Sequence, residues 1–256
     1  MTEIFILAAQ RSAIGSYGGS LKDTSPIDLA IPVAKDAIKK SGLPSDAIQH
    51  ATYGHVIHTE PRDMYSPRCI SIGAGLPETS PAFQVNRLCG SGLQAIVSAT
   101  QLIKLGDCNT ALAGGVEVMS RGPYVLPAQR WGARMGDSNV IDMMTGALHD
   151  PFGIGHMGIT AENIAADYSI SREDMDQFSA QSQGRAAHAR EAGYFKNQIT
   201  PLELTTRRKT VTFDDDEFIR AETTTESLAS LRAAFTKDGS VTAGNSSGIN
   251  DGTASL

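Results

Sequence analysis

The fold is decided by Val85-Asn86-Arg87-Leu88-Cys89-Gly90-Ser91-Gly92-Leu93-Gln94-Ala95-Ile96. This stretch places one cysteine between an apolar extended run and an apolar helical run. Residues 82–85 predict a short buried strand. Residues 93–105 predict a helix whose apolar residues occupy most of its circumference, so we expect a buried helix whose N-terminus points into the interior.

Cys89 is predicted to lie at the N-terminal end of this helix. Gly90 and Gly92 lack a Cβ, so the chain can turn sharply and another backbone or a ligand can approach. The unpaired N–H groups and aligned peptide dipoles at a helix N-terminus favour a thiolate. The dipole contributes about 0.3–1 kcal/mol, or about 2 kcal/mol when buried, whereas lowering a thiol pKa from about 8.5 to below about 7 requires at least about 2 kcal/mol. A nucleophile here would therefore need a basic partner such as histidine.

A structural role for Cys89 is the alternative, because free cysteine is among the most buried residue types. The chain has three cysteines, Cys69, Cys89 and Cys108. Their number is odd and their spacing matches no metal-ligand pattern, so they indicate neither a disulfide framework nor a zinc site. This usage fits a reducing compartment, and we expect a cytoplasmic protein.

Composition narrows the class of protein. With 256 residues, 41% apolar and 20% charged, the chain is long enough for one large domain or two small ones. Its net charge of −6 argues against general binding to nucleic acid or to anionic membranes. Residues 4–9 are too short for a signal peptide and predict a first strand. No apolar run approaches the length that spans a membrane.

A helix is predicted over residues 25–42. Ser25 can serve as its N-cap and Pro26 can occupy its first position. Gly42 supplies the stop signal. Pro32 should kink this helix, because an interior proline removes a backbone donor.

Strands and helices alternate along the first part of the chain. Residues 51–58 predict a strand, residues 67–74 a helix and residues 110–117 a strand of small residues. Together with the helix at residues 93–105, this order predicts a parallel sheet covered on both faces. Residues 119–151 show little periodicity, so we expect a loop-rich excursion from the sheet.

Two further patterns are weak signals. His55 and His58 would lie on opposite faces of a strand, so we expect structural or solvent-facing roles rather than a metal pair. Residues 153–158 satisfy G-x-G-x-x-G and precede a helix predicted over residues 161–168, with Thr160 as its N-cap. A dinucleotide site requires a strand before such a motif, and residues 147–152 do not predict one.

Three stretches together resemble the thiolase family: VNRLCGSG at residues 85–92, HMGITAEN at residues 156–163 and VTAGNSSGINDG at residues 241–252. Their order and spacing agree with that family, and the likeness runs from Arg11 to the last residue. Residues 60–65 and 130–137 most resemble the bacterial broad-range β-ketothiolases of polyester synthesis.

The resemblance implies a coenzyme A enzyme that exchanges acyl groups in two steps through an acyl-cysteine, with Cys89 as the nucleophile. In synthesis, an acetyl group loads onto the thiolate, and the carbanion of a second acetyl-CoA attacks it to give a 3-ketoacyl-CoA. Degradation reverses these steps. The backbone N–H of Cys89 is implied as one oxyanion donor. Acyl-CoA is the substrate, and neither a tightly bound cofactor nor a metal is implied.

The family's coenzyme-binding positions carry over onto this sequence. They are Arg220 and Ser227 near the adenine end, Ala243, Ser247, Leu148 and His156 along the pantetheine, and Met157 in the acyl pocket. The implied fold is an α/β thiolase-like αβαβα sandwich of two similar halves. This chain would supply part of the first half (residues 1–118), an inserted loop domain (119–249) for coenzyme binding and tetramerisation, and the start of a returning strand (250–256). Residues 121–144 would assemble a homotetramer.

The sequence also departs from the family pattern. It covers roughly the first two-thirds, and it lacks the Gly-His-Pro, Asn-Glu-Ala-Phe and Cys-Gly-Gly motifs, which include the activating histidine and the second catalytic cysteine. We therefore expect a thiolase portion that is catalytically incomplete. The alternatives are a non-catalytic fragment that binds coenzyme A or a partner protein, and an NAD-dependent oxidoreductase that uses residues 153–158.

Overall fold

The computed structural model describes residues 3–205 and 209–256, which form two compact units. The sheet unit takes its residues from Met1–Pro123, Lys196–Glu217 and Asn250–Leu256, and the loop unit from Tyr124–Phe195 and Phe218–Ile249. Residues 196–217 fall inside the predicted loop domain 119–249 but cluster with the sheet.

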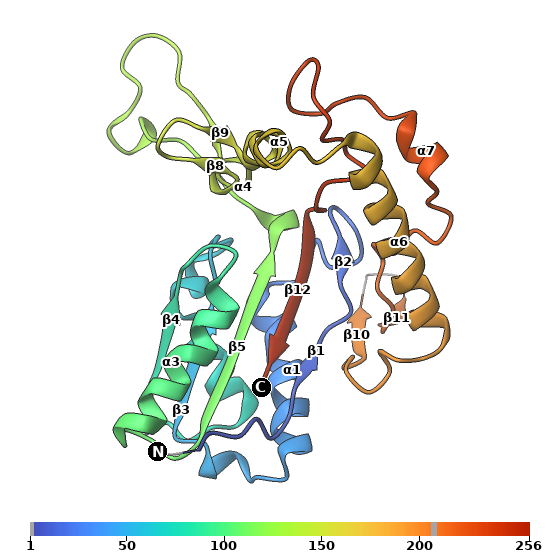
Figure 1. The fold of residues 1–256 in the computed structure, drawn as a ribbon. Coiled ribbons are helices and arrows are strands. Elements are labelled where there is room, and N and C mark those ends of the chain that lie inside the picture. The colour runs from blue at the N-terminus through green and yellow to red at the C-terminus, as the bar shows by residue number, and fades with distance from the viewer. Residues whose placement is uncertain (1–2, 206–208) are drawn as a thin grey trace. The chain divides into compact units, whose positions relative to one another are not determined.

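The sheet unit is built on a six-stranded sheet (Figure 1). The strand order is β1 (Gln10–Arg11), β12 (Asn250–Ser255), β5 (Ala111–Val118), β3 (His50–Gly54) and β4 (Ala82–Val85), and β2 (Gly15–Ser16) also pairs with β12. β3 is parallel to both β4 and β5, which confirms the predicted parallel arrangement for these strands. β12 is antiparallel to β5 and β1, so the sheet as a whole is mixed.

Helices cover both faces of this sheet. α3 (Ser91–Leu105) lies on one face, and α1 (Pro26–Ser41) and α2 (Ser66–Ala74) pack together on the other (Figure 1). Short 3-10 turns lie at η1 (Ser45–Ala47), η2 (Pro61–Tyr65) and η3 (Met119–Arg121). α1 has its predicted ends, because Ser25 Oγ accepts the Asp28 N–H at 3.2 Å and Gly42 follows the helix with φ of 76°. α1 continues through Pro32 as one element.

The prediction that α3 is buried is wrong. Its buried residues are Ser91, Ala95 and Ala99, whereas Leu93 and Leu105 are 70% and 78% exposed. One face of α3 packs on β3 and β5, and the opposite apolar face is exposed in the described part of the chain. A helix that is apolar all round needs cover on both sides, and the sheet covers only one. β4 is likewise only partly buried, because it forms an edge of the sheet.

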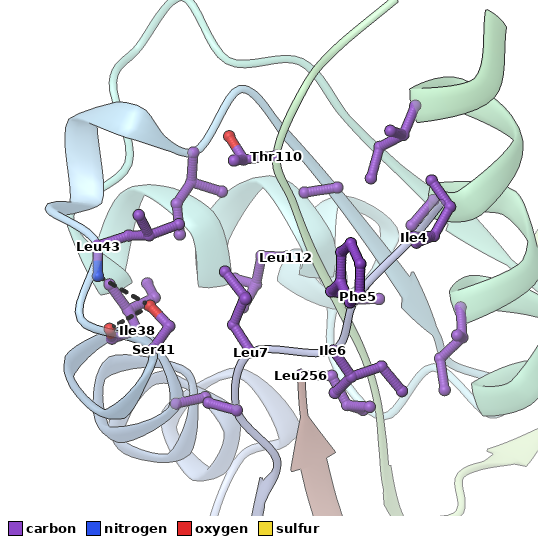
Figure 2. A pocket seen from close by; sticks show the side chains of 18 of the residues that line it. Ile4, Phe5, Ile6, Leu7, Ile38, Ser41, Leu43, Thr110, Leu112 and Leu256 are labelled. Carbon is purple, nitrogen blue, oxygen red and sulfur yellow. Dashed lines mark hydrogen bonds between the residues drawn. The ribbon is translucent and has the colours of Figure 1, made fainter. Parts of the chain in front are cut away.

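Residues 4–9 do not form the predicted first strand. The register pairs Gln10 with Ser255 and Arg11 with Ala254, so each earlier residue would face a position after Ser255. Residues 4–9 pair with no strand in the described structure, so they lack the ladder hydrogen bonds that define a strand. Residues 4–8 line an apolar cavity of about 130 Å³ together with Leu112 and Leu256, and Figure 2 shows Ile4, Phe5, Ile6 and Leu7 there.

The loop unit combines two longer helices, α5 (Met157–Asp167) and α6 (Arg172–Glu191), with short helices and two-residue strands. The short elements are β6 (Tyr124–Val125), η4 (Gln129–Trp131), β7 (Ile141–Asp142), α4 (Met143–Ala147), β8 (His149–Asp150), β9 (Gly155–His156) and α7 (Thr225–Ala229). The hairpin of β10 (Leu202–Thr205) and β11 (Thr210–Phe213) falls in the sheet unit. Thr160 is not an N-cap, because α5 begins earlier and is capped by His156.

An ion pair fastens β1 to residues 214–217. Arg11 Nη1 and Nη2 donate to Asp216 Oδ1 and Oδ2 at 2.8 and 3.0 Å. The Ile14 N–H also donates to Asp216 Oδ1, at 2.8 Å. Both charged side chains are largely buried, and a bidentate pair of this kind is stronger and more directional than a neutral hydrogen bond.

We expect Asp216→Asn to lower the free energy of unfolding by about 3 kcal/mol, because the Arg11 guanidinium loses its carboxylate in a poorly hydrated site. Urea denaturation followed by circular dichroism measures the change. Asp214→Asn is the control, since Asp214 is exposed two residues away, and it should shift the value by less than about 0.5 kcal/mol. Equal effects from the two variants would contradict the role given to Asp216.

Candidate active site

Cys89 is exposed in the turn between β4 and α3. The turn is closed by its own polar groups. Asn86 Oδ1 accepts the Leu88 N–H at 3.0 Å, and Ser91 Oγ accepts the Arg87 N–H at 2.8 Å. Ser91 Oγ donates in turn to the Leu88 carbonyl at 2.6 Å. The predicted strand–turn–helix arrangement is therefore present, with Cys89 directly before Gly90, the N-cap of α3.

Leu88, directly before Cys89, has a left-handed backbone with φ of 48°. This conformation costs an L-residue about 1–2 kcal/mol. It persists only where neighbouring contacts hold it, as two hydrogen bonds do here: the Leu88 N–H donates to Asn86, and the Ser91 hydroxyl donates to the Leu88 carbonyl. The backbone strain therefore lies at the position that presents the cysteine.

The N-terminus of α3 lies against the carboxyl ends of β3 and β5. A Cβ on Gly54 would be 2.6 Å from the Ser91 carbonyl carbon, and a Cβ on Gly115 would be 3.4 Å from Gly92 Cα. Glycine thus lets helix and sheet backbones approach closely. One turn further on, Thr52 Oγ1 donates to the Ala95 carbonyl at 2.9 Å. The first turn of α3, whose N–H groups can receive a negatively charged group, is thereby fixed at the end of the sheet.

Leu148, His156 and Met157 lie together in the loop unit. The Met157 N–H donates to the Leu148 carbonyl at 2.8 Å. His156 Nδ1 accepts the Gly158 N–H at 3.0 Å, which makes this histidine the N-cap of α5. The imidazole therefore carries its proton, when neutral, on Nε2.

Phe235 is a site residue that the sequence did not indicate. Its ring stacks on His156 with the centroids 4.9 Å apart and the planes at 19°. A Cβ on Gly158 would lie 2.2 Å from the same ring, so the third glycine of the motif at 153–158 makes room for it. The motif also belongs to an antiparallel hairpin of β8 and β9, which differs from the strand–turn–helix unit of a dinucleotide site.

Glu162 in α5 holds the segment that leads to Ala243 and Ser247. Its carboxylate accepts the N–H groups of Ser240 and Val241 at 2.9 to 3.1 Å. Burial raises the pKa of Glu162, but these hydrogen bonds outweigh it and hold the pKa below its usual value. Ala243 and Ser247 themselves are exposed.

Arg220 and Ser227 are also exposed. The Arg220 N–H donates to Gln183 Oε1 at 2.8 Å, and its guanidinium lies 5.7 Å from the centre of the Phe218 ring. Ser227 belongs to the capping box of α7, whose next residue, Leu228, packs against Gly244 beside Ala243.

The structure thus places Cys89 in the sheet unit and the seven candidate coenzyme residues in the loop unit. The prediction that His55 and His58 lie on opposite faces of a strand is wrong, because β3 ends at Gly54 and their rings are 5.2 Å apart. Among the described residues no group of three or more His, Cys, Asp or Glu could hold a metal ion.

No helix in the described ranges is long and apolar enough to cross a membrane.

Known proteins share this sequence pattern. The family described as "Thiolase, N-terminal domain" matches residues 4–256. Beta-ketothiolase BktB from Cupriavidus necator is 51% identical over 255 residues, which cover 99% of this chain and 65% of the relative. Acetyl-CoA acetyltransferase from Chromobacterium violaceum is 46% identical, with 99% and 65% covered.

Solved structures share the fold. The crystal structure of Bacillus anthracis acetyl-CoA acetyltransferase has a TM-score of 0.93 and 43% identity, and the match covers 98% of this chain and 64% of that one. Human mitochondrial 3-ketoacyl-CoA thiolase in complex with CoA has a TM-score of 0.93 and 38% identity, with 98% and 63% covered. The chain spans 65% of the length of the curated relatives named above. It therefore belongs to the thiolase family, with the fold of the N-terminal portion of a thiolase.

Proposed function

We propose that this chain carries the acyl-accepting part of a thiolase, an acetyl-CoA C-acyltransferase, with Cys89 as the nucleophile. The observation that carries this proposal is the exposed thiol in a strained turn directly before the N-terminus of α3. That position leaves the thiol accessible and puts helix N–H groups next to it, which suits attack on a thioester carbonyl.

The acyl-loading step is a thioester exchange. The Cys89 thiolate attacks the carbonyl carbon of an acyl-CoA, the backbone N–H of Cys89 stabilises the resulting oxyanion, and coenzyme A leaves as its thiolate. One C–S bond forms and one breaks, so a strong base is not needed once the thiolate exists. Condensation with a second acetyl-CoA does need a base to remove its α-proton, and the motifs that supply it in the family do not occur in these 256 residues. We therefore infer acyl loading without full turnover.

We further propose that the loop unit binds the coenzyme as substrate. Arg220 and Ser227, both exposed, would contact the adenine end. Ala243, Ser247, Leu148 and His156 would follow the pantetheine, and Met157 would contact the acyl group. The stack of His156 on Phe235 gives this part of the loop unit a rigid apolar wall.

A homotetramer in the cytoplasm, serving synthesis of 3-ketoacyl-CoA for polyesters, is the finer proposal. Its assembly surface would be residues 121–144, where Trp131 and Met135 are 86% and 98% exposed. Apolar side chains exposed to this extent commonly mark a protein–protein contact.

Incubation with acetyl-CoA should acetylate Cys89, because its thiol is accessible and the reaction exchanges one thioester for another. Intact-mass and peptide mass spectrometry measure the modification. Cys89→Ala should abolish it, whereas Cys108→Ala should not, since Cys108 is buried.

Acetylation that survives in Cys89→Ala would remove Cys89 from its proposed role. Turnover of acetoacetyl-CoA with free coenzyme A by this chain, at a rate typical of enzymes, would instead contradict the inferred incompleteness.

Arg220→Ala should weaken coenzyme A binding by roughly 10-fold or more, because a hydrogen bond to a charged group contributes about 1.5–3 kcal/mol. Isothermal titration calorimetry measures the affinity, and raising the salt concentration should narrow the difference. Arg185→Ala is the matched control, since Arg185 is exposed on α6 and outside the candidate residues. Equal affinities for the Arg220→Ala and wild-type chains would remove Arg220 from the site.

A further inference from the structure

Four polar side chains form a cluster at the carboxyl ends of β3 and β5. His55 directly follows β3 and is fully buried, and Glu117 is the next-to-last residue of β5. Ser66 begins α2, and Gln84 lies in β4, the strand that leads to Cys89. The proposed acyl transfer uses none of these four side chains.

Their hydrogen bonds fix the position of one proton. Gln84 Nε2 donates to the His55 carbonyl at 3.2 Å, so its Oε1 is the acceptor for the Ser66 hydroxyl at 2.7 Å. A serine hydroxyl has a single proton, so Ser66 Oγ must accept in its other contact, 3.2 Å from His55 Nδ1. His55 Nδ1 is therefore a donor and carries a proton.

The other ring nitrogen then faces a carboxylate. His55 Nε2 is buried, has no hydrogen-bond partner in the described structure and lies 3.8 Å from Glu117 Oε1. The oxygens of Glu117 accept the N–H groups of Val56 and Ile57 at 2.9 and 3.1 Å. A neutral His55 would present a lone pair at Nε2, and an ionised Glu117 presents only lone pairs. Two such acceptors face each other unfavourably unless one of them holds a proton.

The surrounding charges agree with a retained proton. Burial raises the pKa of Glu117 to about 7, an effect that the N–H groups of Val56 and Ile57 oppose and the nearby Asp63 reinforces. Burial also lowers the pKa of His55, an effect that Asp63 opposes and His58 reinforces. Glu60, in the segment that follows His58, is paired with Arg121 at 3.1 Å.

We propose that His55 and Glu117 share one buried proton, and that this proton ties the end of β5, through His55, Ser66 and Gln84, to the strand that enters the Cys89 turn. We call these four residues the proton-dependent latch of the sheet unit, because the shared proton completes the chain of contacts between β5 and β4. This role is separate from the proposed acyl transfer. The latch holds one proton whether that proton resides on Glu117 Oε1 or on His55 Nε2.

The latch has a defined dependence on pH. Between the ordinary values of about 4.5 for glutamate and 6.5 for histidine, an unfolded chain also binds one proton at these two residues, on histidine. Between about pH 4.5 and 6.5, the folded and unfolded chains therefore bind the same number of protons at these two residues. The pair then does not change how the free energy of unfolding depends on pH in this range. Burial raises the pKa of Glu117 to about 7. Taken alone, Glu117 therefore contributes fully to the free energy of unfolding below about pH 4.5, and this contribution is lost as the pH rises through about 7.

Nuclear magnetic resonance of the whole 256-residue chain tests the shared proton directly. The carboxyl carbon of Glu117 and the ring nitrogens of His55 are followed from pH 4.5 to 8, with Glu117→Gln used for assignment. We expect one titration step near pH 7 and none between pH 4.5 and 6.5. A Glu117 carboxyl that ionises near pH 4.5 while His55 is neutral at pH 6 would overturn the proposal.

Denaturation of Glu117→Gln provides a second measurement. We compare the unfolding equilibrium constant of the variant with that of the wild-type chain. The ratio of variant to wild type, called the excess below, should be largest at pH 5 and should fall by roughly 50- to 100-fold by pH 8. Glu162→Gln is the matched control, because Glu162 also accepts two backbone N–H groups but has its pKa lowered. Its excess should stay constant between pH 5 and 8. A constant excess for Glu117→Gln as well would mean that Glu117 is only a structural acceptor.

Discussion

The close approach of the α3 backbone to the carboxyl ends of β3 and β5 is the constraint on which the rest of the sheet unit depends. Any side chain larger than hydrogen at Gly54 would meet the Ser91 backbone. Because the helix cannot move away without losing the Thr52–Ala95 bond, the chain between β4 and α3 must turn within a few residues. That short turn forces Leu88 into a left-handed conformation and leaves Cys89 exposed.

Helix ends and the turn at Cys89 could be predicted from the sequence, because neighbouring residues determine them. Ser25 and Gly42 mark the ends of α1 through a side-chain cap and a left-handed glycine, both of which act within four residues. The strand–turn–helix arrangement around Cys89 was predictable for the same reason. The motifs that resemble thiolases then gave the family, which the match over residues 4–256 shows.

Features that depend on residues far apart in the chain could not be predicted from the sequence. The apolar run predicted a strand at residues 4–9, but a strand needs a neighbouring strand, and the pairing of β1 with β12 begins only at Gln10. Apolar residues around the whole circumference of α3 predicted a buried helix. Burial also depends on what covers the face turned away from the sheet, and this face is exposed in the described residues. Phe235 has no periodic signal of its own, and its importance arises only because it stacks on His156. The pairing of His55 with Glu117 joins residues that lie at the ends of different strands.

The position of β12 has a consequence for how the protein is made. β12 comes from residues 250–255 but lies between β1 and β5, both formed much earlier in the sequence. During synthesis, the parallel strands and their helices leave the ribosome first, and the flank of β5 stays uncovered until the whole loop unit has been translated. Such a long-range closure is slow, and the uncovered strand can pair wrongly while it waits. The flank of β5 is therefore the edge at which the nascent chain is most open to wrong pairing until residues 250–255 are made.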